Sequence, residues 1–374
     1  MADAPSGVGP PSGPLLGLKV LEFAAIGPVP FRGMLMSDLG ADVIRIDRPG
    51  AAPADRFTVE ARGRRSVALD LKTDAGRESA LRLMAAAEGV IEGFRPGVME
   101  RLGLGPDVAL GRNPKLAYGR MTGWGQDGPY AQAAGHDINY LALTGALHAI
   151  GPKDRPAIPL NLVGDFGGGA MPLAFGMLAA ILHARATGEG QVIDCAMTDG
   201  AISLMGMLYG HLARGTWVDQ RASNIIDGGA HFYNVYQCAC GGWIALGAIE
   251  PQFYAELVGK AGLDDPDFVR QHDQDQWPML TDRLADIIRR RTRAEWTRIL
   301  EGGDACFAPV LSMTEAPAHP HNIARQAFVD IDGVTQPAPI PRFSHTPGTI
   351  QAGPAAPGDH DRSAYQDWGV EPAP

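Results

Sequence analysis

The sequence predicts an α/β fold with a mostly parallel sheet and a second, smaller domain. Short apolar runs alternate with helical stretches from Leu18 to Trp124, at the spacing of βαβ units. Around Gly215–Gly229 the pattern changes to a loop of Asp, Asn, Arg and Gly, and a β-rich segment follows. A chain of 374 residues is also long enough for two domains of roughly 100–200 residues each.

The elements of the first region are expected in strict alternation. Strands are expected at Lys19–Phe23, Asp42–Ile46, residues 66–71, Gly89–Phe94, Lys115–Met121 and Gln191–Asp194. Helices are expected at Phe31–Leu39, Asp74–Glu88, Val98–Leu102, Ile138–Ala149 and Met171–Ala186. In parallel sheets of this kind, ligands bind beyond the carboxyl ends of the strands. We therefore expect the large domain over residues 1–200 to carry a ligand site at that edge.

The second domain is expected at residues 215–315. Its β-rich part is Tyr233–Ala248, with the turn Gly241-Gly242 between two strands, and polar helices follow as far as Leu300. After Ala316 the chain becomes rich in Pro and Gly.

Composition excludes several classes of protein. The net charge of −10 argues against a broad nucleic-acid-binding surface. Four cysteines in a chain of this length suggest no disulfide framework, and they fit a reducing compartment. No signal peptide is visible, so we expect a cytoplasmic protein. The apolar run Phe166–Leu182 has 17 residues and is interrupted by glycines and Pro172, which favours a buried core helix over a membrane span.

The candidate phosphate-loop and metal-ligand motifs lack the neighbouring sequence features that such sites require. The run GVGPPSG near the N-terminus lacks the strand and helix that a dinucleotide-binding loop requires. The pairs Cys238/Cys240 and His319/His321 lack a second pair at ligand spacing, so we expect no metal site.

Basic residues gather near the ends of the expected strands. They are Arg45, Arg48, Arg62, Arg64, Arg65, Lys72 and Arg95. They could converge on one polyanion, such as the phosphates of a nucleotide or of coenzyme A. They could equally be solvated loop charges, and spacing alone leaves both interpretations open.

Four ionisable residues stand at loop–helix junctions in apolar surroundings. Asp137 and Asp165 each precede a helical run, so that each could simply be an N-cap. Glu250 precedes Pro251, which is typical of a helix start. His136 follows a glycine and precedes a run without formal charge. Together the four would suit acid–base chemistry, but the sequence does not show that they converge.

Several long motifs, in order, carry a family resemblance. The segments GHDINYLALTGALHAIG, NLVGDFGGGAMPLAFGMLAAI, GQVIDCAMTDG and GAIEPQF resemble those of the α-methylacyl-CoA racemases, within the family III CoA-transferase superfamily. The opening LGLKVLEFAAIGPVP and its continuation resemble the first βαβ unit of that superfamily. The resemblance covers roughly residues 15–350.

The resemblance implies an interlocked homodimer. Each chain would have a large Rossmann-like domain, completed by a return segment at residues 316–374, and a smaller inserted α+β domain. The active site would lie between the large domain of one subunit and the small domain of the other. The expected partners are an acyl-CoA thioester and a second copy of the chain. No cofactor is implied, because coenzyme A (CoA) enters as part of the substrate.

The resemblance also assigns roles to residues. His136 and Asp165 would be the acid–base pair, and Glu250 of the partner's small domain would hydrogen-bond the histidine. Asp137 would open the helix whose amides stabilise an enolate oxygen. Contacts with coenzyme A would fall on Arg48, Leu69, Asp70, Leu71, Lys72, Gly93, Phe94, Arg95, Arg101, Gly135, Ile138, Asn139 and Tyr140.

The implied reaction is racemisation of 2-methylacyl-CoA by a two-base proton transfer. The main alternative is a CoA transferase of the same superfamily, in which Asp165 would be a nucleophile. A third possibility is a homologue that binds CoA without catalysis. His136 and Glu250 favour the racemase. The acyl chain would lie on an apolar surface to which Met121, Met197, Met205 and Met207 could contribute, although methionines at helical spacing are more often core.

Overall fold

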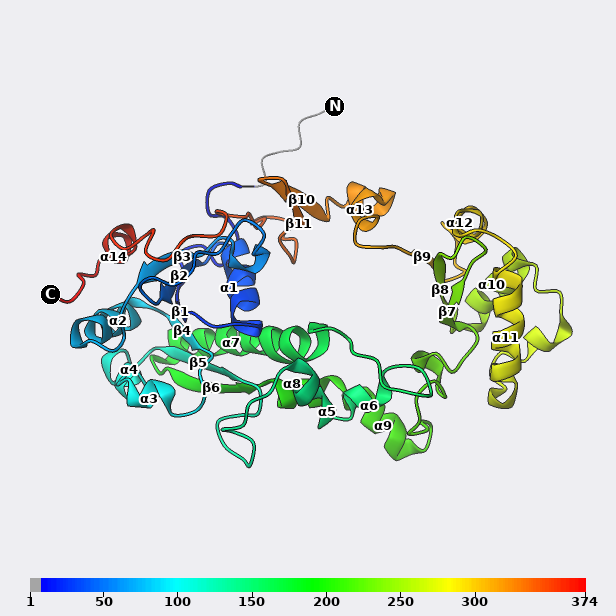
Figure 1. Ribbon diagram of the computed structural model, residues 1–374, viewed down its shortest axis with the longest axis horizontal. Coiled ribbons are helices and arrows are strands. Elements are labelled where there is room, and N and C mark those ends of the chain that lie inside the picture. Colours follow the sequence, from blue (N-terminus) through cyan, green and yellow to red (C-terminus); the bar gives the residue numbers. More distant parts are fainter. Residues whose placement is uncertain (1–7) are drawn as a thin grey trace. The chain divides into compact units, whose positions relative to one another are not determined.

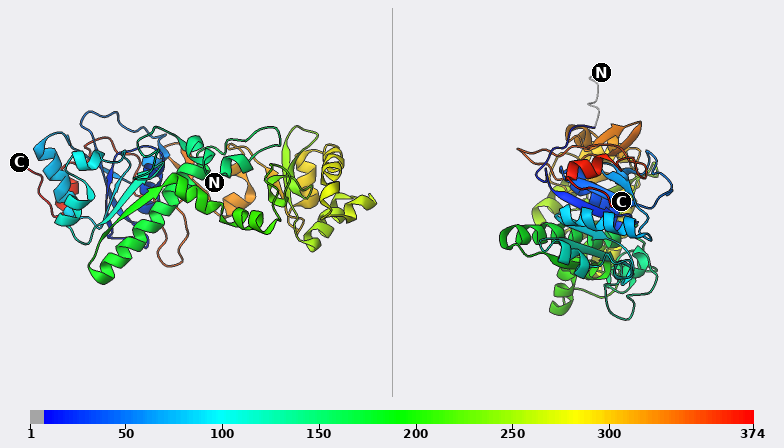
Figure 2. Two further views of the ribbon diagram at one scale, coloured as in Figure 1. Left: turned by 90° about the horizontal axis from the view of Figure 1, so that it is seen from below. Right: turned by 90° about the vertical axis from the view of Figure 1, so that its left-hand side faces the viewer.

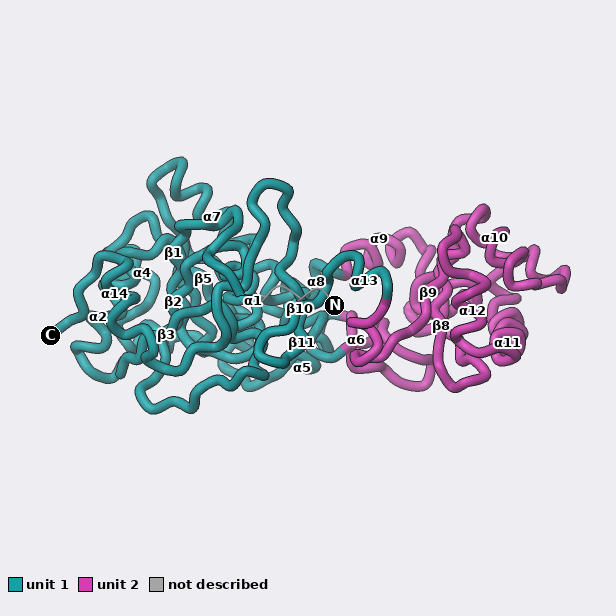
Figure 3. Tube along the Cα trace, turned by 90° about the horizontal axis from the view of Figure 1, so that it is seen from above, with its two compact units in different colours: residues 1–144, 160–204, 320–374 teal, residues 145–159, 205–319 magenta. Residues whose placement is uncertain are grey.

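The chain forms two compact units in a computed structural model that describes residues 8–374 (Figures 1 and 3). Unit 1 combines the chain up to Thr144 with Leu160–Leu204 and Pro320–Pro374. Unit 2 combines Gly145–Pro159 with Met205–His319. The expected division had one inserted segment at residues 215–315, whereas the contacts assign the loop at 145–159 to unit 2 as well.

Unit 1 is built on six parallel strands in the order β3-β2-β1-β4-β5-β6. The strands are β1 (Lys19–Phe23), β2 (Asp42–Asp47), β3 (Arg65–Ala68), β4 (Gly89–Glu92), β5 (Ala117–Thr122) and β6 (Gln191–Ala196). The expected α/β class with a parallel sheet is confirmed, although β3 ends three residues earlier than expected. The order reverses between β1 and β4, which is where such sheets bind ligands.

Helices cover both faces of this sheet. On one face α2 (Asp74–Ala86), α4 (Pro106–Arg112) and α14 (Ser363–Trp368) share a core with Leu21 and Phe23 of β1. On the other face α1 (Pro28–Asp38) and α7 (Met171–Thr187) share a core with Val20. Figure 2 shows α14, in red, close to α2. The short α3 (Val98–Arg101) and α8 (Met197–Leu204) complete this part.

Two expected helices differ in the structure. The run expected as one helix over Ile138–Ala149 is broken at Gly145, which has a φ of 81° that favours glycine. It forms α5 (Asp137–Ala142) and α6 (Ala146–Ala149). Before α7, residues Leu162–Ala170 form a π-helix, η2, a conformation that is rare and often found at functional sites.

Helix α7 is a core helix on one side only. Its inner face, with Leu173 and Met177, packs against Gly119 of β5. On its outer face Met171, Phe175 and Leu182 are 50%, 77% and 66% exposed. The continuous helical run Leu162–Thr187 is long and apolar enough to cross a membrane by length and composition alone. The expectation of a buried core helix is therefore correct for the inner face and wrong for the outer one.

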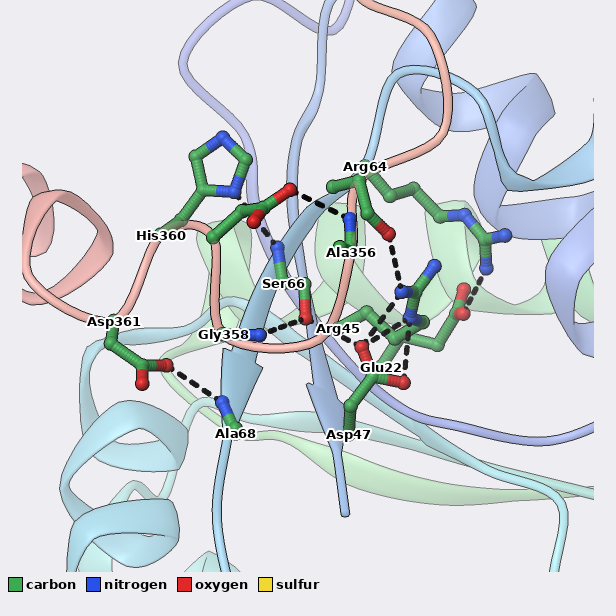
Figure 4. A network of polar contacts seen from close by, with 12 residues as sticks. Glu22, Arg45, Asp47, Arg64, Ser66, Ala68, Ala356, Gly358, His360 and Asp361 are labelled. Atoms are coloured by element: carbon green, nitrogen blue, oxygen red, sulfur yellow. Dashed lines mark hydrogen bonds and ion pairs between the residues drawn. The ribbon is translucent and has the colours of Figure 1, made fainter. Parts of the chain in front are cut away.

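The C-terminal segment of unit 1 is fixed against the edge of the sheet (Figure 4). It includes the hairpin β10 (Phe328–Ile331) and β11 (Val334–Pro337), after the short helix α13 (Pro320–Ala324). The His360 amide donates to the Ser66 carbonyl over 3.0 Å, and the Ala68 amide donates to the Asp361 carboxylate over 2.7 Å. These bonds satisfy backbone groups along the free edge of β3.

Unit 2 has a three-stranded antiparallel sheet of β7 (Tyr233–Gln237), β8 (Trp243–Gly247) and β9 (Phe307–Val310). One face packs on α10 (Pro251–Ala261), α11 (Trp277–Ile288) and α12 (Arg293–Leu300). Helix α9 (Gly206–Arg214) precedes the sheet. The predicted strands on either side of Gly241-Gly242 are confirmed.

Candidate active site

A cavity of about 550 Å³ lies in unit 1 beyond the carboxyl ends of β1, β4 and β5. Its walls come from the loops that follow these strands, from the start of α5 and from η2. This is the edge at which the alternating pattern predicts a ligand site. Three of the four ionisable residues singled out in the sequence line it, namely His136, Asp137 and Asp165.

His136 is the N-cap of α5, with extended backbone angles, and it is exposed at the cavity. Its amide donates to Asn139 Oδ1 over 3.1 Å, and the Asn139 amide donates back to the His136 carbonyl over 2.8 Å. This reciprocal pair fixes where the helix starts. The expectation that Asp137 is the N-cap is wrong, since Asp137 is the first residue of the helix proper.

Asp137 connects α5 to the π-helix. It is 8% exposed, and its Oδ2 accepts the backbone amide of Asp165 over 2.7 Å. A side chain at Gly164 would collide with this carboxylate, so the glycine permits the close approach. Asp137 therefore holds the backbone of Asp165 beside the start of α5.

Asp165 lies inside the π-helix, so its expected role as an N-cap is also wrong. Burial raises the pKa of its carboxyl group above the usual range, and the nearby Asp137 carboxylate raises that pKa further. A hydrogen bond from the Asn161 side chain and the charge of His136 act in the opposite direction. A carboxylate with a raised pKa is a stronger base than an ordinary aspartate.

Among the cavity residues that the sequence did not single out, two lie next to the Asp165 carboxylate. Asn161 directly precedes the π-helix, four residues before Asp165, and this spacing could have revealed their contact. Gly27 has a φ of 69°, and a Cβ there would lie 3.3 Å from Asp165 Oδ2. The loop after β1 thus leaves room for the carboxylate.

The residues expected to contact coenzyme A separate into two groups. Those that line the cavity are Gly93, Phe94, Arg95, Gly135 and Tyr140. Those that do not line it are Arg48, Leu69, Asp70, Leu71, Lys72, Arg101, Ile138 and Asn139. Tyr140 is fixed by its hydroxyl, which donates to the Gly135 carbonyl, and by edge-on contact with Trp124 at 4.8 Å between ring centroids.

The hypothesis that the basic residues converge on one polyanion is wrong for four of them. Arg45 binds Asp47 at 2.7 Å, Arg62 binds Asp38 at 2.6 Å, Arg64 binds Glu22, and Arg65 binds Asp42 at 2.6 Å. The first three pairs are buried, so these guanidinium groups neutralise internal carboxylates. Arg48, Lys72 and Arg95 are exposed.

Glu250 lies in unit 2 as the exposed N-cap of α10, with Pro251 at the first helical position as expected. The backbone just before it is fixed by Gln271, whose side-chain amide donates to the carbonyls of Ala248 and Ile249 over 3.0 and 2.8 Å. Within residues 8–374, no group of three or more His, Cys, Asp or Glu side chains is placed to hold a metal ion.

The family model described as CoA-transferase family III matches residues 15–361. The chain belongs to this family. It is 43% identical to an α-methylacyl-CoA racemase of Mus musculus, over 95% of this chain and 93% of that protein. It is 40% identical to the racemase of Homo sapiens, with the same coverage of both chains.

More distant relatives carry other names. A succinyl-CoA–D-citramalate CoA-transferase of Chloroflexus aurantiacus is 30% identical, over 96% of this chain and 94% of that enzyme. The crystal structure of a CAIB/BAIF family protein from Brucella suis superposes with a TM-score of 0.82 at 25% identity, and covers 96% of this chain and 100% of that chain. The family resemblance inferred from the motifs is confirmed by these matches.

Proposed function

We propose that the protein interconverts the two configurations at the α-carbon of 2-methylacyl-CoA thioesters. The observation that carries this proposal is that His136 and Asp165 line one cavity, and that the surroundings of Asp165 raise the pKa of its carboxyl group. Racemisation needs a base on one face of the α-carbon and an acid on the other. The relatives that are 40% and 43% identical are both named α-methylacyl-CoA racemases, which supports this proposal.

The proposed mechanism moves one proton in two steps. His136 or Asp165, according to the configuration, takes the proton from the α-carbon, and the electron pair of that C–H bond moves into the thioester to form an enolate. The other residue then returns a proton to the opposite face. General acid–base groups of this kind contribute about 10²–10⁴-fold each. The first amides of α5 would stabilise the enolate oxygen.

Asp137 has a supporting part in this proposal. Its Oδ2 accepts the Asp165 amide, so it would set the distance between the two proton-transfer groups. Its negative charge also keeps the pKa of Asp165 raised. Arg95, at the same cavity, would meet a phosphate group of the coenzyme.

We also propose that the active protein is a homodimer and that Glu250 of the partner subunit hydrogen-bonds His136. The outer face of α7 supports an obligate partner, because its large apolar side chains are exposed in a single chain. On α8, Ile202 and Leu204 are exposed as well. A second copy that covers these side chains would remove them from water.

A CoA transferase is the second candidate, and the relative from Chloroflexus aurantiacus favours it. In that mechanism Asp165 would attack the thioester carbonyl and form a mixed anhydride with the acyl group, releasing the coenzyme as a thiolate. His136 would have no step of its own. The two candidates therefore differ in what each predicts for the α-proton.

The deciding experiment supplies (2R)- and (2S)-methylacyl-CoA separately, in heavy water and without any free carboxylic acid. The racemase should incorporate deuterium at the α-carbon and form both configurations from either one. If no α-proton exchanges, but coenzyme A moves to an added carboxylic acid and hydroxylamine traps Asp165, the protein is a transferase.

A further inference from the structure

A chain of three charged side chains lies beside the cavity, behind the turn that follows β4. Glu92, at the end of β4, is fully buried, and its Oε1 accepts Nε–H of Arg120 over 2.9 Å. Arg120, on β5, reaches with its other end to Glu100 of α3, over 2.7 and 3.2 Å. One arginine thus joins two carboxylates from different elements.

The second oxygen of Glu92 fixes the wall of the cavity. Glu92 Oε2 accepts the backbone amide of Phe94 over 2.7 Å. Phe94 is the middle residue of the turn Gly93–Arg95, which lines the cavity. On its other side the turn is equally confined, because a Cβ at Gly93 would lie 3.0 Å from both Ala25 and Val29. The turn is therefore held between Glu92 and the start of α1.

The same series of charged side chains, Glu92, Arg120 and Glu100, reaches α3, which carries Arg101. The Val98 amide donates to the Arg95 carbonyl over 3.1 Å, so the turn continues directly into α3. Glu100, adjacent to Arg101 on that helix, is the far end of the chain of charges. Arg95 and Arg101 are therefore attached at the two ends of one hydrogen-bonded unit.

Stability alone does not account for this arrangement. Burial raises the pKa of the Glu92 carboxyl group, while the Phe94 amide and Arg120 lower it. A buried ion pair is often no more stabilising than a well-packed apolar pair of the same volume. What the carboxylate adds is a fixed acceptor for one backbone amide at the cavity wall.

We propose that Glu92, Arg120 and Glu100 are positioning residues that hold Arg95 in place for the anionic part of the coenzyme. This proposal rests on the proposed function, since it takes a CoA thioester to be the ligand of the cavity. The three residues act through the turn and through α3 and do not themselves touch the substrate.

The test is Glu92→Gln, compared with Glu88→Gln as a matched control. Glutamine keeps the size of the side chain, but its amide nitrogen cannot accept from either the Phe94 amide or Arg120. We expect Kd and KM for the thioester to rise about tenfold with kcat within about threefold, as loss of uniform binding gives. Glu88 lies just before β4, at the opposite end of the strand. The Glu88→Gln variant loses an ion pair with Arg185, and its Kd and KM should stay unchanged.

A second variant, Glu100→Gln, tests the same proposal in case Glu92→Gln does not fold. The Glu100 side chain is 46% exposed, so the fold should tolerate its loss, and Kd should rise in the same direction by a smaller factor. The weaker binding should also respond less to added salt, because Arg95 would no longer face the phosphate in a fixed position.

Calorimetric titration with the thioester separates the possible failures. If Glu92→Gln and Glu100→Gln both melt at lower temperature but bind as the wild type does, the three residues are merely structural and the proposal is wrong. If the wild type binds the thioester but exchanges no α-proton, the racemase proposal fails, and a higher Kd in Glu92→Gln and Glu100→Gln still supports the positioning proposal. If the wild type binds no CoA thioester, both fail.

Discussion

Unit 1 contains two clusters of charged residues that differ in how their charges are balanced. Along β1, β2 and the segment before β3, each of three arginines has a carboxylate partner: Arg45 with Asp47, Arg62 with Asp38, and Arg64 with Glu22. In the cavity, Asp137 and Asp165 approach each other as like charges. In the first cluster each arginine is neutralised by a carboxylate, whereas in the second two carboxylates lie close together.

The difference shows which cluster can do chemistry. Each carboxylate in the paired cluster is bound to an arginine and does not line the cavity. Asp165 is half-buried, faces another carboxylate and has a raised pKa, so it takes up a proton at a higher pH than an ordinary aspartate does. Substitutions in the two clusters should therefore separate activity from stability.

The largest expected effect is on activity, from His136→Ala and Asp165→Ala. Each variant should lower the rate of racemisation by about 10²–10⁴-fold, because one face of the α-carbon loses its acid or base. Neither should lower the melting temperature as a broken buried pair would. Each variant should still exchange the α-proton of one enantiomer, and the two variants should prefer opposite enantiomers, as deuterium incorporation from separate (2R) and (2S) substrates would reveal. Equal exchange from both enantiomers in either variant contradicts the two-base mechanism.

Substitutions in the cluster of paired charges should lower stability and leave activity unchanged. Arg62 donates to both oxygens of Asp38 and also to Gln336 and Pro337. Arg62→Met would leave the Asp38 carboxylate buried without its partner, at a cost of about 3–5 kcal/mol in the free energy of unfolding. Urea denaturation should detect this loss, while kcat of the folded fraction stays unchanged.

The same variant has a pH signature. Burial already raises the pKa of Asp38 above its unfolded value, and Arg62 lowers it. Without Arg62 the folded pKa must rise further, so the loss of stability should be greatest above that folded pKa. It should shrink as the pH falls towards the ordinary range for aspartate, because the protonated acid needs no partner. A loss that does not depend on pH would mean that packing, and not charge, is responsible.

A smaller effect of opposite sign is expected from Asp165→Asn. The raised pKa of Asp165 means that its charged form is disfavoured in the folded protein at neutral pH. The neutral amide should therefore stabilise the fold by up to about 1 kcal/mol, within the range of other stabilising substitutions at functional sites. The gain should vanish as the pH falls below the ordinary aspartate range, where the wild-type acid is also neutral. Thermal melts of both proteins across this range would measure it.

The smallest effect is expected from Asn161→Ala. The Asn161 side chain hydrogen-bonds the Asp165 carboxylate and so lowers its pKa. Its loss should raise that pKa and move the acidic limb of the pH–rate profile to higher pH, for the enantiomer whose proton Asp165 removes. The profile for the other enantiomer, in which His136 is the base, should shift less.

The fold could be predicted from the sequence wherever burial alone dictates an element. The strands at Lys19–Phe23 and Asp42–Asp47 are apolar runs of strand length, and both were placed within a residue of their observed ends. The break at Gly145 was not predictable from periodicity, because the apolar pattern continues through it. Helix was expected from Phe166 onwards, as the start of the apolar run Phe166–Leu182, but the start at Leu162 and the π-helical form were not, because neither leaves a periodic signal in the sequence.

Some residues of the candidate site could be named from the sequence, but their geometry could not. Family motifs named His136 and Asp165, and the cavity brings them together. That Asp137 binds the Asp165 amide, 28 residues later in the chain, depends on how α5 meets η2 and leaves no local signal. The partners of the basic residues could not be predicted either. An arginine at the end of a strand has the same sequence pattern whether it binds a phosphate or a buried carboxylate.

The C-terminal segment that lies along β3 has a consequence for the growing polypeptide on the ribosome. Residues 320–374 belong to unit 1, but they are synthesised after the whole of unit 2. Until they emerge, the Ser66 carbonyl lacks the His360 amide, the Ala68 amide lacks the Asp361 carboxylate, and Arg45 lacks the Ala355 carbonyl. The inserted unit 2 can finish folding first, while the earlier part of unit 1 waits with an open strand edge. A nascent chain that stalls before residue 320 should therefore recruit chaperones and aggregate more readily than one that stalls after the last residue.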